Sequence, residues 1–110
     1  MLNQVVIAGR LVNDPVVEEN EEGKKVIYIT VAVPRPYKNI EGEYETDFIK
    51  CILWNAIAET TAEYCKKGDI IGVKGRLQTG SYETENGDKK YTMDLIAEKV
   101  SFLSSKKEEE

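Results

Sequence analysis

One short segment of the chain combines side chains that could bind a nucleic-acid strand. In the sequence DFIKCILW, the two-residue period of an extended strand places Phe48, Lys50 and Trp54 on one face. The alternate positions from Ile49 to Leu53 are all apolar and are expected to face a hydrophobic core. Aromatic rings stack on bases while a neighbouring cation neutralises phosphate. The segment is therefore predicted to be a strand with one core face and one binding face.

Other aromatic and basic residues extend this candidate face. Tyr82 and Tyr91 are expected to lie directly opposite each other in a hairpin, because Asn86-Gly87 is typical of a two-residue turn. Each aromatic alone could be ordinary packing, and exposed cations also keep a sheet soluble. Aromatics and cations together favour binding. The predicted contacts with a single-stranded nucleic acid are Tyr37, Phe48, Trp54, Tyr82, Tyr91, Arg35, Lys38, Lys50, Lys67, Lys74 and Arg76.

Catalytic and nucleotide-binding motifs are not found in the sequence. The chain has no histidine, which removes the commonest general base and metal ligand. The glycines from Gly68 to Gly75 run from a predicted helix into a strand, and neither G-x-x-x-x-G-K-[ST] nor G-x-G-x-x-G occurs. Gly72 and Gly75 are instead expected to let a barrel strand bend. We expect no enzymatic activity, no cofactor and no metal.

Size and charge set broader limits. The 110 residues, 41% of them hydrophobic, are enough for one compact domain. A net charge of −5 argues against a nucleic-acid partner, but seven of the 20 acidic residues lie in two clusters, at 18–22 and 108–110, which can sit away from a basic face. Cys51 and Cys65 are expected to be buried thiols. The N-terminus lacks signal-peptide features and no long apolar run occurs, so a cytoplasmic location is expected.

Alternation and turn residues divide the chain into short strands. One helix is expected to begin with an Asn55 N-cap and to end at Lys66-Lys67-Gly68, and a proline-bounded loop is expected over 34–46. The predicted strands are Val5–Leu11, Lys25–Val33, Asp47–Trp54, Asp69–Leu77 and Tyr91–Leu103. This order predicts an all-β, five-stranded OB-fold Greek-key barrel with one short helix between strands three and four. The domain is expected to span 1–103, followed by a charged, disordered tail over 104–110.

Several motifs in this chain resemble those of the bacterial single-stranded DNA-binding protein family, in order, over about residues 1–103. They are GRL-x-x-DP, DFI-x-C-x-x-W, AE, KG-x-x-x-x-V-x-GRLQT and SYE. The resemblance implies that Tyr37, Phe48, Trp54 and Tyr82 stack on bases. It also implies sequence-independent binding and protection of single-stranded DNA in replication, recombination, repair or DNA uptake. A homotetramer with subunit contacts near Asn3–Ile7 is implied as well.

The chain departs from the family pattern at several positions. Glu18, Ala56 and Gly80 stand where the family often has cations, and Pro34 replaces a usual asparagine. Fewer phosphate contacts predict weaker binding, because less counterion is released. The family's acidic C-terminal tip is missing from SSKKEEE, so recruitment of replication and repair proteins through it is not expected. Two alternatives stay open: an OB-fold primosome-accessory or protein-interaction module with weak DNA binding, and an RNA-binding OB domain.

Overall fold

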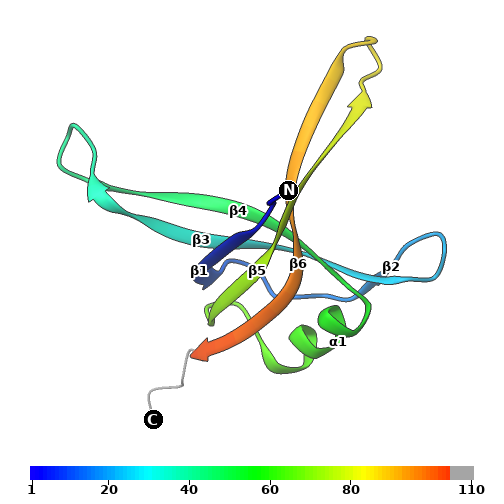
Figure 1. The fold of residues 1–110 in the computed structure, drawn as a ribbon, viewed down its shortest axis with the longest axis horizontal. Helices are drawn as coiled ribbons and strands as arrows, with labels where there is room; N and C mark the ends of the chain where they lie inside the picture. Colours follow the sequence, from blue (N-terminus) through cyan, green and yellow to red (C-terminus); the bar gives the residue numbers. More distant parts are fainter. Residues whose placement is uncertain (105–110) are drawn as a thin grey trace.

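A computed structural model describes residues 1–104 and consists of strands with a single helix (Figure 1). The elements are β1 (Val5–Leu11), β2 (Glu18–Glu19), β3 (Lys25–Lys38), β4 (Tyr44–Trp54), α1 (Asn55–Tyr64), β5 (Ile70–Glu83) and β6 (Lys89–Ser104). The predicted tail lies outside the described residues, apart from its first position. β2 was not predicted, because its two glutamates are untypical of a strand; they pair with the start of β3.

Five strands close into a barrel. Their order in the sheet is β1-β5-β6-β4-β3, and β1 also pairs with β3, where Arg10 lies opposite Ala32. β4 and β6 are parallel, with Cys51 opposite Leu95, whereas the other pairs are antiparallel. α1 connects β4 to β5. The predicted five-stranded OB-fold barrel, with its helix between the third and fourth main strands, is thus confirmed.

The core forms where alternating apolar positions of the strands meet inside the barrel. Ile27, Ile29 and Val31 of β3 are buried, as the alternation in that strand predicts. From β4, Cys51 and Leu53 are buried with them. Their neighbours in the same cluster are Leu11, Ala58, Cys65, Ile71, Val73, Leu95 and Ala97. Both cysteines are free, and burial raises the pKa of Cys51 to about 12 and that of Cys65 to about 11.

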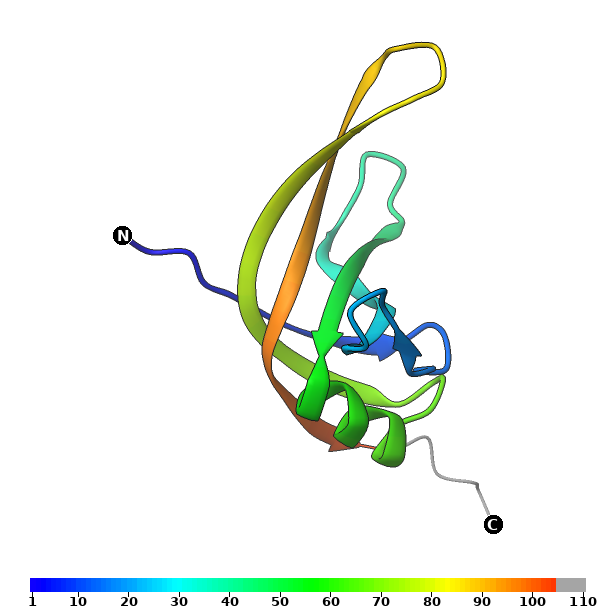
Figure 2. The same ribbon diagram turned by 90° about the vertical axis from the view of Figure 1, so that its right-hand side faces the viewer.

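Two long hairpins project from the barrel, away from α1 (Figures 1 and 2). We call the outer part of the β3–β4 hairpin, between Pro34 and Thr46, the β3–β4 arm. The outer part of the β5–β6 hairpin, between Leu77 and Leu95, is the β5–β6 arm. The prediction of a loop over 34–46 is wrong, because β3 continues to Lys38 and β4 begins at Tyr44. Proline is tolerated because the pairing shifts register between Pro34 and Lys38.

The turn of the β5–β6 arm differs from the prediction. Thr84 N–H donates to Asp88 O (2.8 Å) and Gly87 N–H donates to Thr84 O (3.0 Å), which encloses three residues rather than two. Gly87 has a positive φ of 87°, but Asn86 does not, so the two-residue type I′ turn is not formed. The register moves accordingly: Tyr82 pairs with Lys90, and Tyr91 with Ser81. The predicted direct pairing of Tyr82 with Tyr91 is therefore wrong.

The ends of α1 also differ from the predicted capping. Asn55 is the first helical residue, with a left-handed φ of 53°, and Trp54 is the N-cap without a side-chain cap hydrogen bond. The helix ends at Tyr64, before the lysines, and Cys65 is the C-cap. Gly68 instead has a φ of 97° in the turn before β5, where its N–H donates to Leu11 O (2.9 Å). The glycine thus joins the helix exit to β1 rather than capping the helix.

Gly75 and Gly72 of β5 prove to have different roles. A Cβ at Gly75 would lie 2.0 Å from the carbonyl oxygen of Ile96, at a register shift between Lys74 and Gly75. Gly75 is therefore required where β5 and β6 approach closely at a bulge. A Cβ at Gly72 would make only ordinary contacts, the nearest at 3.6 Å. The expectation that the two glycines let the strand bend stays a prediction, and the close backbone approach is found at Gly75 but not at Gly72.

Candidate nucleic-acid interface

The outer face of β4 has the composition predicted from its alternation. Phe48 is 65% exposed, Lys50 is exposed and Trp54 is half-buried. On the opposite face, Cys51 and Leu53 are buried. The predicted division of this strand into a core face and an outer face is confirmed. An exposed aromatic ring next to a cation is the arrangement that accepts stacked bases and their phosphates.

β3 adds a further aromatic to this face. Antiparallel pairing places Thr30 opposite Lys50 and Tyr28 opposite Ile52. Paired residues have their side chains on the same face of a sheet, so Tyr28 lies on the outer face, where it is 55% exposed. Tyr28 was not among the predicted contacts. The alternation of β3 indicates this position, because Tyr28 falls on the face opposite to the buried Ile27 and Ile29.

A groove runs between β4 and the β5–β6 arm. Predicted contacts from three strands line it: Phe48 and Lys50 of β4, Tyr82 of β5 and Tyr91 of β6. Tyr82 is 57% exposed and Tyr91 75%. Their side chains start from opposite faces of the arm, since Tyr82 pairs with Lys90 and not with Tyr91. Both nevertheless border the groove, which also contains the exposed Met93.

The β3–β4 arm carries two more exposed aromatic rings. Tyr37, a predicted contact, is 62% exposed and Tyr44 is 63% exposed. The ammonium of Lys38 lies 5.7 Å from the centroid of the Tyr44 ring. Sequence reasoning missed Tyr44 because it placed this residue in a loop. Once β4 is known to begin at Tyr44, the two-residue period puts its side chain on the same face as Phe48.

Arg35 is held by two carboxylates of β4, one in the arm and one at its base. Its Nη2 lies 2.8 Å from Asp47 Oδ1, and its Nη1 lies 2.8 Å from Glu45 Oε1. The hydrogen bond and the opposite charge of Asp47 raise the pKa of Arg35, and the hydrogen bond from Arg35 in turn lowers the pKa of Asp47. These acids occupy the β4 positions that alternate with Phe48. The predicted DNA contact of Arg35 therefore stays a prediction, and the guanidinium is already paired.

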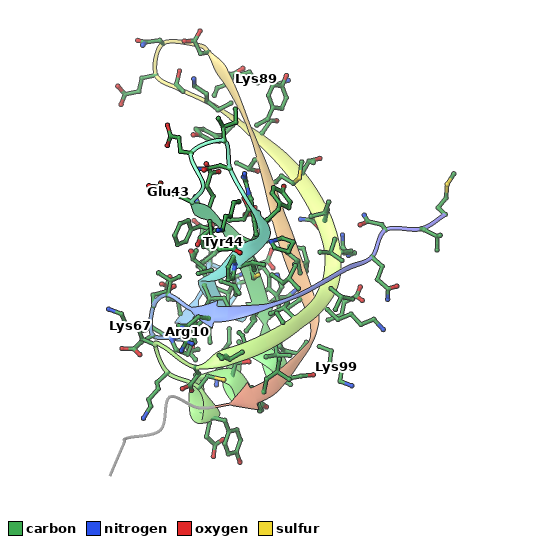
Figure 3. The ribbon with its side chains drawn as sticks, turned by 90° about the vertical axis from the view of Figure 1, so that its left-hand side faces the viewer. Arg10, Glu43, Tyr44, Lys67, Lys89 and Lys99 are labelled. Atoms are coloured by element: carbon green, nitrogen blue, oxygen red, sulfur yellow. The ribbon has the colours of Figure 1, made fainter. Side chains whose placement is uncertain are left out.

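The remaining predicted cations are not brought into the groove. Lys74 and Arg76 are exposed on β5, where Lys74 lies between Val6 of β1 and Lys99 of β6. Lys67 follows α1, and its backbone N–H donates to Asp14 Oδ1 (2.7 Å). In Figure 3, Lys67 and the labelled Lys89 of the β5–β6 arm lie at opposite ends of the molecule. The roles in binding assigned to Lys67, Lys74 and Arg76 stay predictions.

Among residues 1–104, no group of three or more His, Cys, Asp or Glu side chains is placed to hold a metal ion. No helix in this part of the chain is long and apolar enough to cross a membrane.

Comparison with known proteins adds a family and a fold match. The model of the single-strand binding protein family matches residues 2–103. The chain is 45% identical over 109 residues to single-stranded DNA-binding protein B of Bacillus subtilis, covering 99% of this chain and 96% of that protein. It is 46% identical over 106 residues to single-stranded DNA-binding protein 3 of Listeria innocua, covering 96% of this chain and 66% of that protein. A solved Plasmodium falciparum SSB complex with ssDNA has the same fold, with a TM-score of 0.83, 23% identity and coverage of 94% of this chain and 97% of that chain.

Proposed function

We propose that this chain, which belongs to the single-strand binding protein family, binds single-stranded DNA with little sequence preference. The observation that carries the proposal is the outer face of β4, where the exposed Phe48 ring, Lys50 and Trp54 alternate along one strand. A phenylalanine ring that is 65% exposed is not serving the core. The relatives named above are single-stranded DNA-binding proteins, which supports the same activity here.

Binding would proceed by stacking and charge neutralisation. Bases would stack on Phe48 and Trp54 while Lys50 neutralises a phosphate between them, and Tyr82 and Tyr91 would contact the strand from the other side of the groove. Every base has a flat π-face, so stacking does not depend on sequence. This mode requires an unpaired strand, because the bases of a duplex are stacked on each other and not available to side chains.

The fluorescence of Trp54, the chain's single tryptophan, tests this proposal directly. Titration with dT oligomers is expected to quench the emission until the sites are saturated, and a duplex of the same length should bind much more weakly. Binding without a change in emission would remove Trp54 from the interface. If neither dT oligomers nor mixed-sequence single strands bind by any method, the proposed function is wrong.

We further propose that the protein acts without catalysis, as a cover for single strands exposed in the cytoplasm during replication, recombination, repair or DNA uptake. Membership of the family supports this role. The chain spans 96% of the Bacillus subtilis relative and 66% of the Listeria innocua relative. RNA and DNA oligomers of matched sequence, titrated side by side, would identify an RNA-binding domain by a preference for RNA.

A homotetramer is also part of the proposal. Positions 5–10 of β1 pair with β5 along one edge, whereas on the other edge only Arg10 and Leu11 pair with β3 within the described residues. Asn3 extends the paired edge, because its side-chain amide exchanges two hydrogen bonds with the backbone of Leu77 (2.9 and 3.0 Å). Val6 is 71% exposed. An open strand edge next to exposed apolar side chains favours pairing with a second copy.

A further inference from the structure

Tyr44 continues the outer face of β4 onto the β3–β4 arm. It lies four residues before Phe48, so both side chains point to the same face of the strand. At the usual rise of a strand, about 13 Å separates the two positions. Both rings are similarly exposed, 63% for Tyr44 and 65% for Phe48. A single strand that lies on Phe48 and continues toward the tip of the arm would meet Tyr44 next.

Tyr44 has a neighbouring cation, Lys38, just as Phe48 has Lys50. Lys38 is the pairing partner of Tyr44, and its ammonium lies 5.7 Å from the ring centroid. An exposed cation–π contact is weak, so Lys38 can turn to a phosphate at little cost. The pair therefore repeats, at the base of the arm's turn, the aromatic and basic composition of the barrel face.

The opposite face of the arm holds this pair in place. Asp47 and Glu45 bind the guanidinium of Arg35, and the other oxygen of Glu45 accepts a hydrogen bond from the Asn39 side chain (2.9 Å). Asn39 Oδ1 in turn accepts the backbone N–H groups of Glu41 and Glu43, both at 2.9 Å. These contacts connect the stem of the arm to its turn. A surface that is already ordered loses less conformational entropy on binding.

We propose that Tyr44 and Lys38 form an additional nucleotide-binding position on the β3–β4 arm, with a base stacked on Tyr44 and its phosphate near Lys38. The inference rests on the proposed function, single-stranded DNA binding. It adds Tyr44 to the two contacts already predicted on this arm, Tyr37 and Lys38, and places the Tyr44 ring against DNA rather than against another subunit. It also predicts that the single-stranded DNA is bound along the whole length of β4, from Trp54 at the end of this β-strand to Tyr44 at its beginning.

The test compares Tyr44→Ala with the wild-type protein on a ladder of dT oligomers of about 4 to 16 nucleotides, the range that one OB domain covers. Oligomers too short to reach the arm are expected to bind both proteins equally. For the longer ones, Tyr44→Ala should weaken binding by about 5- to 150-fold, by a similar factor at low and high salt, as for loss of one stacked base. Tyr44→Phe keeps the ring and should bind like wild type.

Ile40→Ala serves as the matched control, because Ile40 is fully exposed in the turn of the same arm. It should bind every oligomer like wild type. Equal binding of Tyr44→Ala and wild type at all lengths would overturn the inference and leave the proposed function intact. A change in the oligomeric state of Tyr44→Ala, measured by light scattering, would assign Tyr44 to a subunit contact instead. If the wild-type protein binds no dT oligomer, the proposed function fails first.

Discussion

Arg35 and Asp47, twelve residues apart in the chain, form an ion pair across the base of the β3–β4 arm. Arg35 Nη2 lies 2.8 Å from Asp47 Oδ1, and Nε lies 3.2 Å from both carboxylate oxygens. The hydrogen bond from Arg35 holds the pKa of Asp47 below its usual range. Arg35, which the sequence predicts as a DNA contact, is therefore already bound by a carboxylate of the protein. This ion pair orders the arm that carries Tyr37 and Tyr44.

The first prediction concerns the pH dependence of this pair. Since the folded-state pKa of Asp47 is depressed, its contribution to stability is complete above the unfolded pKa of about 3.9 and is lost as the pH falls through the folded value. Thermal unfolding of wild type and Asp47→Asn should differ by a constant amount above about pH 5, and the difference should shrink on acidification. A difference independent of pH down to about 2 would contradict the role of this carboxylate.

The second prediction separates stacking from charge on β4. Trp54→Ala should weaken DNA binding by a similar factor at low and high salt, because a ring releases no counterions. Lys50→Ala should flatten the plot of log K against log salt concentration by about 0.7, the value for one phosphate of a single strand, and leave the tryptophan quenching largely intact. Titrations at several salt concentrations measure both. An unchanged slope for Lys50→Ala with an altered slope for Trp54→Ala would reverse the assignment.

The third prediction concerns assembly. The wild-type protein should be a homotetramer in dilute solution, and Val6→Asp should shift it to smaller species, because a carboxylate would be placed on the exposed face of β1. Light scattering coupled to size-exclusion chromatography measures the mass. Val16→Asp is the control, since Val16 is also exposed, at 62% against 71% for Val6, but lies outside β1. A monomeric wild type would refute the proposed tetramer.

The fourth prediction compares two glycines of β5. Gly75→Ala should destabilise the fold by about 1 to 3 kcal/mol or more, because its Cβ would lie 2.0 Å from the Ile96 carbonyl oxygen and the strands would have to separate. Gly72→Ala should change stability by less than about 1 kcal/mol, since its nearest contact would be 3.6 Å. Urea denaturation measures both variants. Equal losses would show that the bulge at Gly75 can relax.

Local alternation carried much of the information about the binding face. The sequence by itself determined which side of β4 is buried, because successive side chains of any strand point to opposite faces. It therefore identified Phe48, Lys50 and Trp54 as outer residues. The sequence order of the five barrel strands, and the place of the helix between them, also followed from local patterns of apolar and turn residues, whereas β2 did not.

Tertiary structure decided which of the outlying residues meet. Whether Tyr82 lies opposite Tyr91 depends on the φ of Asn86, and a shift of one residue moves the two rings to opposite faces. The prolines in β3 suggested a loop over 34–46, so Tyr44 was not recognised as a strand residue. Only the pairing of Lys38 with Tyr44 shows that both strands continue past the prolines. The pairing of Arg35 with Asp47 likewise requires the two strands to be side by side. Long-range register set these contacts, and no local period in the chain specifies it.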